Sequence, residues 1–98
     1  MSDYVDGDVN EVDERDEVSA DTAVAVLTYL AKALADEPEA VSVKVEDSAK
    51  GVKLSLAVAP GDMGRIIGRR GRTAQALRTL VGAAGARDGV ATFVDIVD

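Results

Sequence analysis

The sequence has neither cysteine nor histidine, and its aromatic residues are two tyrosines and one phenylalanine, with no tryptophan. Without cysteine there is no disulfide framework and no cysteine-based metal site. Without histidine, and with no carboxylate pair that stands out from the other charges, the groups that most enzymes use for acid–base or nucleophilic chemistry are missing. The composition therefore predicts a protein that is not an enzyme and that holds no metal or cofactor.

Long hydrophobic runs are also absent. The longest apolar-rich segment, residues 23–35, is interrupted by Thr28, Tyr29 and Lys32 and is too short to span a bilayer. The chain begins without the basic and apolar regions of a signal peptide. We therefore expect a cytoplasmic protein with no membrane partner, whose 98 residues include one small domain.

Charge is distributed unevenly along the chain. The net charge is −7, but residues 1–21 hold nine acidic residues and one basic residue, a balance of −8. Residues 22–98 hold nine acidic and ten basic residues, a balance of +1. Residues 60–80 contain five arginines and one aspartate, a balance of +4. The field around this segment is therefore positive and attracts anions, although the whole chain is acidic.

Residues 1–20 predict an acidic, disordered tail, because their few apolar side chains cannot bury enough surface to offset the entropy of ordering. A calcium-binding loop is the alternative for this segment. Glu11 stands where such a loop needs glycine, and too few residues precede it for an entering helix, so we favour the solvated tail. The oxygen ligands of that loop would be Asp6, Asp8, Asn10 and Glu17.

The folded domain is expected over residues 21–98 and begins with a helix. Asp21 can cap this helix, and Pro38 stops it. The apolar residues recur at helical spacing and predict one buried stripe, which consists of Val24, Leu27, Leu30, Ala31 and Leu34.

A hairpin follows the helix, with strands at residues 41–46 and 52–58 and a turn at residues 47–51. Apolar and polar residues alternate along both strands, so each strand has one buried face. Lys44 and Lys53 fall on the opposite face. Their interpretation as solvated residues is favoured over a position beside a ligand.

Two helices and a last strand complete the domain. Asp62 can cap a short helix at residues 63–67, and a second helix is expected over residues 73–84, with Leu77, Leu80 and Val81 inward. Gly85 and Gly89 end it, and residues 90–97 form a strand in which Phe93 packs inward. The last strand returns after a helical crossover and can lie parallel to a hairpin strand. The predicted class is α+β, with a three-stranded mixed sheet and helices packed on one face.

The motif Ile66-Ile67-Gly68-Arg69-Arg70-Gly71-Arg72 lies between the two later helices. Its glycines allow a tight turn whose backbone approaches a partner closely, and its arginines favour an anionic partner. It lacks the Gly-Lys-Ser/Thr ending of a P-loop, and isoleucine stands where a dinucleotide fingerprint needs glycine. A helix–turn–helix corner with merely solvated arginines is the remaining alternative.

Gly82-Ala83-Ala84-Gly85 repeats the glycine spacing without any charge, and it predicts a close helix contact and a helix end. The glycine spacing alone is therefore weak evidence. The specific signal is the combination of the glycines with the arginines and the flanking helices.

Residues 20–98 resemble the small bacterial single-KH-domain proteins of the KhpA family. The resemblance rests on the segments 62–74, 77–79 and 83–86, and the helix-first order αββααβ matches the type II KH topology. It implies binding of single-stranded RNA, in which the GXXG loop clamps a run of about four nucleotides. It also implies an RNA chaperone or post-transcriptional regulator that pairs with itself or with a larger KH protein of the KhpB/Jag type and is linked to cell-shape control.

The RNA-binding residues expected from this motif are the loop and its flanks. The alternative is a KH scaffold that serves as a dimerisation or adaptor module with little direct RNA binding. The acidic tail has no counterpart in the family pattern, and the −8 and +4 balances suggest that it competes with RNA for the arginines. The expected site consists of Gly68, Arg69, Arg70, Gly71, Arg65, Ile67, Arg72 and Thr73.

Overall fold

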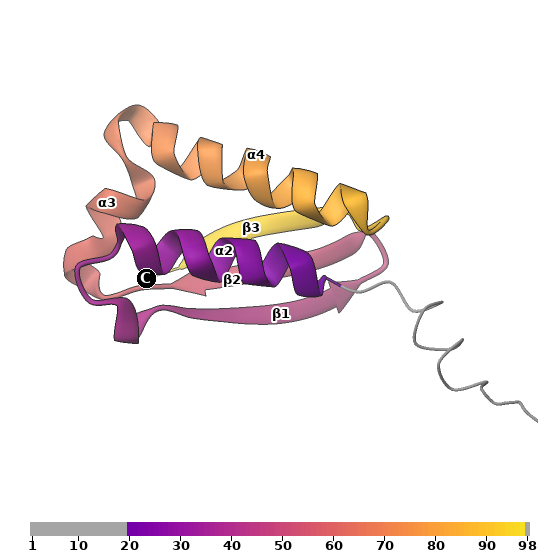
Figure 1. Cartoon of the computed structure of the whole chain (residues 1–98), viewed down its shortest axis with the longest axis horizontal. Helices are drawn as coiled ribbons and strands as arrows, with labels where there is room; N and C mark the ends of the chain where they lie inside the picture. The colour runs from indigo at the N-terminus through magenta and orange to yellow at the C-terminus, as the bar shows by residue number, and fades with distance from the viewer. Residues whose placement is uncertain (1–19, 98) are drawn as a thin grey trace, which may run out of the picture.

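The computed structural model describes residues 20–97, which form a helix-covered sheet (Figure 1). The predicted tail and the alternative calcium loop lie outside the described residues, apart from Ala20. No helix within the described part of the chain is long and apolar enough to cross a membrane. The elements in chain order are α2 (Asp21–Leu34), β1 (Ser42–Ser48), β2 (Gly51–Ala57), α3 (Met63–Ile67), α4 (Arg72–Arg87) and β3 (Thr92–Val97).

The sheet has the strand order β1-β2-β3. β1 and β2 are antiparallel, with Val45 opposite Leu54, and β2 and β3 are parallel, with Leu54 opposite Val94. The parallel pair is possible because α3 and α4 carry the chain back across the sheet. This is the mixed, three-stranded αββααβ arrangement predicted from the sequence, and it agrees with a type II KH-like fold.

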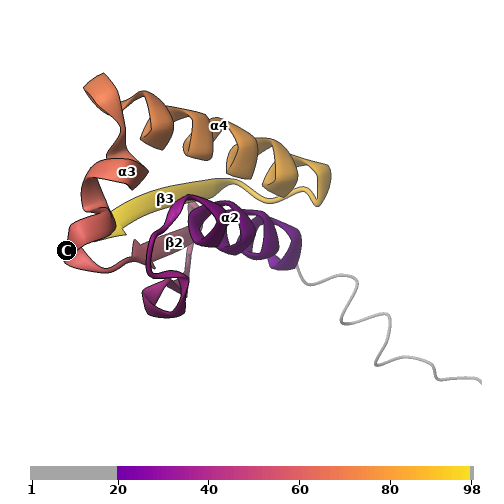
Figure 2. The same cartoon turned by 60° about the vertical axis from the view of Figure 1, so that its left-hand side comes forward.

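The helices cover one face of the sheet, as the two views in Figures 1 and 2 show. Leu54 and Leu56 of β2 point to this face and are fully buried, whereas Lys53, which directly precedes Leu54, is exposed. This alternation follows from the two-residue period of a strand. The fully buried residues of the helices that meet β2 in the core are Ala23, Leu27, Ala31, Ile66 and Val81.

The ends of the helices differ from the prediction. Asp21 is the first helical residue of α2, and Ala20 occupies the cap position. α4 continues through Gly85 to Arg87. A Cβ on Gly85 would lie only 2.9 Å from the carbonyl oxygen of Val90, so the predicted close contact at Gly85 is confirmed and the predicted helix end is wrong.

Several apolar residues expected inside are exposed. Leu34 is 39% exposed and Leu80 is 51% exposed, because the apolar stripes of their helices are wider than the surface that the neighbouring elements cover. Phe93 is 51% exposed because it pairs with Lys53 on the sheet face that carries no helix. Its predicted inward packing is therefore wrong.

Candidate nucleic-acid interface

The turn between α3 and α4 is built from residues with positive φ. Gly68 ends α3 with φ 77° and ψ 172°, and its N–H donates to the carbonyl of Gly64 at 2.8 Å. Gly71 precedes α4 with φ 74° and ψ 13° and donates to the carbonyl of Gly68 at 3.1 Å. Arg70 has φ 60° and ψ 25°, a left-handed backbone conformation that residues other than glycine rarely adopt. Such strained residues concentrate at functional sites.

The two glycines of the turn are needed for different reasons. A Cβ on Gly68 would overlap Thr73, whose side-chain Oγ1 and backbone nitrogen both face that position. The φ and ψ of Gly68 also fall in a region that is essentially restricted to glycine. Gly71 has open space around it, so only its backbone angles favour glycine. The close approach of Gly68 to Thr73 thus connects the turn to the first turn of α4.

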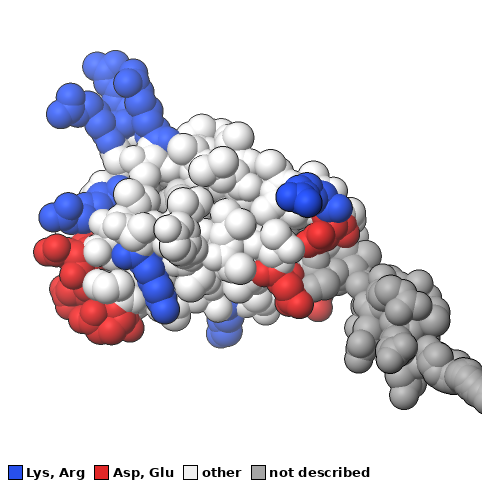
Figure 3. Space-filling model, viewed as in Figure 1, with Lys and Arg blue, Asp and Glu red and all other residues white. Residues whose placement is uncertain are grey.

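The arginines predicted to bind an anion surround this turn. Arg65, Arg69, Arg70 and Arg72 are all exposed. Figure 3 shows basic side chains that project together from the α3–α4 end of the molecule, at the upper left. Within residues 20–97, the three arginines of segment 69–72 form no ion pair, so their charges are available to a ligand.

The N-terminus of α4 adds backbone donors at the same place. α4 is 16 residues long and starts at Arg72, directly after the glycine turn. The first N–H groups of a helix have no partner inside the helix and form the positive end of its dipole. The N–H of Arg72 already donates to the carbonyl of Arg69, so an anion here would meet the following N–H groups of the first turn together with the guanidinium groups.

Asp62 has a role that the sequence prediction missed. It forms no capping hydrogen bond with α3 and is only 1% exposed. Its two carboxylate oxygens instead accept hydrogen bonds from the backbone N–H groups of Asp36 and Glu37, each at 2.9 Å. The side chain thus ties the segment that follows α2 to the start of α3, and the predicted cap of α3 is wrong.

Asp62 also touches the positive rim of the turn. The Nε of Arg65 lies 3.5 Å from Oδ1 of Asp62. The backbone hydrogen bond from Asp36 lowers the pKa of Asp62 below its ordinary value of 3.8, and the bond from Glu37 and the charge of Arg65 act in the same direction. Desolvation by burial opposes these effects but is outweighed. Asp62 is therefore a carboxylate at neutral pH and holds Arg65 beside the turn.

Four apolar residues of α3 and α4 near the turn separate into two groups. Ile66, Ala74 and Leu77 are buried in the core or against it. Ile67 is 37% exposed and directly precedes Gly68, so it alone of the four presents apolar surface beside the turn. The other predicted site residues are brought together by the turn and its two helices.

An apolar hollow of about 380 Å³ lies between α2 and α4. Leu30 and Leu34 line it from α2, and Leu80 lines it from α4. Arg72 and Thr73 form the end of the hollow nearest the turn. Helical periodicity identified its leucines as apolar positions but could not reveal that they remain uncovered.

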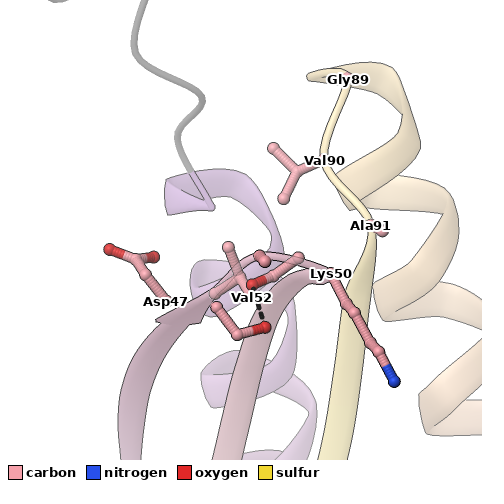
Figure 4. Close-up of a pocket in the computed structure, with 9 residues that line it drawn as sticks. Asp47, Lys50, Val52, Gly89, Val90 and Ala91 are labelled. Atoms are coloured by element: carbon pink, nitrogen blue, oxygen red, sulfur yellow. Dashed lines mark hydrogen bonds between the residues drawn. The ribbon is translucent and has the colours of Figure 1, made fainter.

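A second hollow, of about 730 Å³, lies at the opposite end of α4, between the β1–β2 turn and the segment before β3 (Figure 4). Asp47 and Lys50 point to opposite sides of the β1–β2 turn. The hydroxyl of Ser48 donates to the carbonyl of Gly51 and closes that turn. No charge of one sign gathers at this second hollow. The positive turn therefore remains the better candidate for an anion-binding site, although the hollow beside the turn is smaller.

Arg78 on α4 is a further polar residue that the predicted site did not include. Its Nε donates to the carbonyl oxygen of Val94 on β3 at 3.4 Å. The signal in the sequence is its spacing, because Gly71, Gln75 and Arg78 recur at intervals of four and three residues and share one side of a helix.

Comparison with known proteins agrees with this geometry. The family model described as "KhpA/KhpB, KH domain" matches residues 24–96. RNA-binding protein KhpA of Leifsonia xyli is 49% identical over 72 residues, which cover 74% of this chain and 92% of the relative. RNA-binding protein KhpA of Streptomyces coelicolor is also 49% identical over 72 residues, with 74% and 87% covered. RNA-binding protein KhpA of Caldanaerobacter subterraneus is 46% identical over 68 residues, with 69% and 91% covered.

These relatives are named as RNA-binding proteins, and the family is not an enzymatic one. This agrees with the prediction from composition. The matched residues include all six elements of the fold except the first residues of α2 and the end of β3. The chain belongs to the KhpA/KhpB family of KH domains.

Proposed function

We propose that this chain binds single-stranded RNA by holding its phosphates at residues 68–71. The single observation that carries this proposal is the position, at the N-terminus of α4, of loop arginines that form no ion pair within residues 20–97. The backbone of Gly68 and Gly71 approaches the phosphates, and Arg69 and Arg70 pair with their oxygens. The relatives named RNA-binding protein KhpA support RNA as the ligand.

The flanking residues extend this clamp. Arg65 and Arg72 enlarge the positive rim, and Thr73 contributes its backbone N–H and hydroxyl at the start of α4. Ile67 offers apolar surface to a sugar or base. In this proposal residues 21–98 form the KH domain, and residues 1–20 are an acidic extension of it.

Binding of this kind depends strongly on salt. Few aromatic side chains are available for stacking, so charge supplies most of the affinity. If three or four phosphates are neutralised, the slope of log K against log salt is roughly −2 to −3, at about −0.7 per phosphate for a single strand. A slope near zero would contradict the phosphate clamp.

RNA crosslinking and sequencing with the wild type and with the double variant Arg69→Asp, Arg70→Asp tests the proposal. We expect the variant to lose its crosslinks while it keeps the wild-type thermal denaturation curve. Lys50→Glu with Arg87→Glu is the matched control, because it makes the same change in charge at the far end of α4. Equal crosslinking by all three proteins would overturn the proposal.

We further propose that RNA binding serves an RNA chaperone or post-transcriptional regulator. Its partner is a second copy of the chain or a larger KH protein of the KhpB/Jag type, and its physiological role is in cell-shape control. The family description, which joins KhpA with KhpB, supports the partner. Co-purification with the host's KhpB-type protein, with and without RNase, tests whether the two proteins associate directly.

A protein-interaction module with little direct RNA binding is the second candidate. The apolar hollow between α2 and α4 favours it, because exposed Leu34 and Leu80 border that surface. Leu80→Lys should then abolish partner binding, while the double loop variant would leave RNA crosslinking unchanged. The opposite pattern favours the RNA clamp.

A further inference from the structure

Arg78 links α4 to the edge of the sheet. Its Nε donates to the carbonyl oxygen of Val94, and β3 is an outer strand in the order β1-β2-β3. The outer groups of such a strand have no neighbouring strand to pair with. The guanidinium of Arg78 therefore lies at an open edge, where both helix and strand can contact a ligand.

This position is aligned with the glycine turn. Gly71, Gln75 and Arg78 follow one another along the same side of α4, and Gln75 and Arg78 are exposed. At about 1.5 Å per residue, Arg78 lies roughly 10 Å along the helix from Gly71. An RNA strand whose phosphates are held at the turn can therefore bring a base to Arg78 within the clamped run of about four nucleotides.

The contact with Val94 leaves Arg78 free to act on a ligand. The bond is 3.4 Å long and exposed to solvent, so it is weak and easily exchanged for another. It uses Nε alone, and no residue within 20–97 accepts a hydrogen bond from the two terminal nitrogens. A guanidinium held at one nitrogen is a partly ordered donor fork.

We propose that Arg78 is a specificity-determining residue that reads a nucleobase edge with two adjacent acceptors. Guanine offers O6 and N7, and cytosine offers O2 and N3, whereas adenine places a donor next to its acceptor. A guanidinium fork matches the first two bases and not the third. This inference rests on the proposed function, because the clamp at residues 68–71 must hold the strand in place.

Binding to matched RNA oligonucleotides tests the proposal. Oligo(C) is compared with oligo(U), and alternating oligo(GU) with alternating oligo(AU), all at one length and one salt concentration. We expect the wild type to prefer oligo(C) and oligo(GU) by roughly fivefold or more, the lower end of the discrimination of a bidentate pair. Arg78→Gln should remove both preferences and favour oligo(AU), because a glutamine amide pairs with adenine.

Two further variants separate base reading from charge. Arg78→Lys keeps the charge but loses the planar fork, so the preferences should disappear while the salt slope stays within about 0.3 of the wild-type value, less than half of one phosphate contact. Arg87→Gln on the last turn of α4 is the matched control and should change neither. Thermal denaturation of each variant checks that the fold is intact.

The proposal is overturned if the wild type shows no preference, or if Arg78→Gln changes binding to all four RNAs by the same factor. The first result removes base reading, and the second assigns Arg78 to a phosphate contact or to the link between α4 and β3. Failure of the clamp itself gives a different pattern. In that case Arg69→Asp with Arg70→Asp retains RNA binding, or the wild type binds none of the four RNAs.

Discussion

Gly68 and Thr73 approach each other so closely that no side chain fits on Gly68. The backbone nitrogen of Thr73 would lie 2.8 Å from a Cβ at position 68, and Thr73 Oγ1 would overlap it. Gly71, at the other end of the same turn, has open space around it. The two glycines of one motif are therefore under different constraints.

This difference predicts unequal costs for two alanine variants. Gly68→Ala should lower the free energy of unfolding by about 2–5 kcal/mol, because it combines a glycine-only backbone conformation with steric overlap. Gly71→Ala should cost about 1–2 kcal/mol, since only left-handed backbone strain is introduced. Urea denaturation of the two variants measures both values. Equal losses would show that the contact with Thr73 is not a constraint.

The left-handed backbone of Arg70 allows stability and binding to be separated. Asparagine tolerates positive φ better than most residues, so Arg70→Asn should change the free energy of unfolding by less than about 1 kcal/mol. It should nevertheless weaken RNA binding and make the salt slope shallower by about 0.7, the contribution of one phosphate. Fluorescence anisotropy over a series of salt concentrations measures the slope. A variant that binds with the wild-type slope would exclude a phosphate contact by Arg70.

Asp62 makes the stability of the domain depend on acid pH. Its pKa in the folded protein is below its ordinary value of 3.8 because the backbone N–H groups of Asp36 and Glu37 donate to the carboxylate. Because the folded-state pKa is lowered, the carboxylate's contribution to the free energy of unfolding is present above its ordinary pKa of 3.8. This contribution is lost as the pH falls through the folded-state pKa.

Asp62→Asn should therefore lower the urea midpoint at neutral pH. The amide oxygen can accept from one of the two N–H groups, but the amide NH2 group then faces the other N–H and cannot accept from it. The difference between wild type and variant should shrink as the pH falls below about 4, because the unfolded chain then takes up a proton on Asp62 while the folded protein still holds the carboxylate ionised. Urea denaturation at pH 7 and pH 3 gives both differences. A gap of the same size at both pH values would contradict the proposed role of the ionised carboxylate.

The acidic tail provides a prediction that depends on charge balance. Residues 1–21 carry a balance of −8, and residues 60–80 carry +4. Deletion of residues 1–18 should tighten RNA binding at low salt, because a competing anion is removed from the arginines. The gain should vanish at high salt, where such attraction is screened. Unchanged affinity at low salt would dispose of competition by the tail.

Much of the fold could be predicted because its signals are local. The alternation of Val52, Leu54 and Leu56 with polar residues identifies a strand with one buried face, and the structure places both leucines in the core. The turn at Gly68–Gly71 was equally visible, since few residues other than glycine adopt the angles found there. The crossover between β2 and β3 follows from the helices that lie between them in the chain.

Other features could not be read from local patterns. Leu34 and Leu80 have the periodicity of buried residues, but no element in residues 20–97 covers them fully. Phe93 is exposed because the strand register puts it opposite Lys53, on the open face. Arg78 reaches Val94, 16 positions further along the chain.

The sequence by itself determined the order of elements, the faces of the hairpin strands, and the positive glycine turn between two helices. Each of these depends on the backbone geometry and charge of a few consecutive residues. Only the tertiary structure decided that Asp62 holds the segment after α2, since its backbone partners lie 25 and 26 positions away. It also decided that Arg78 lies at the sheet edge. Such contacts arise from the packing of separate elements, and the spacing of residues within one element does not encode them.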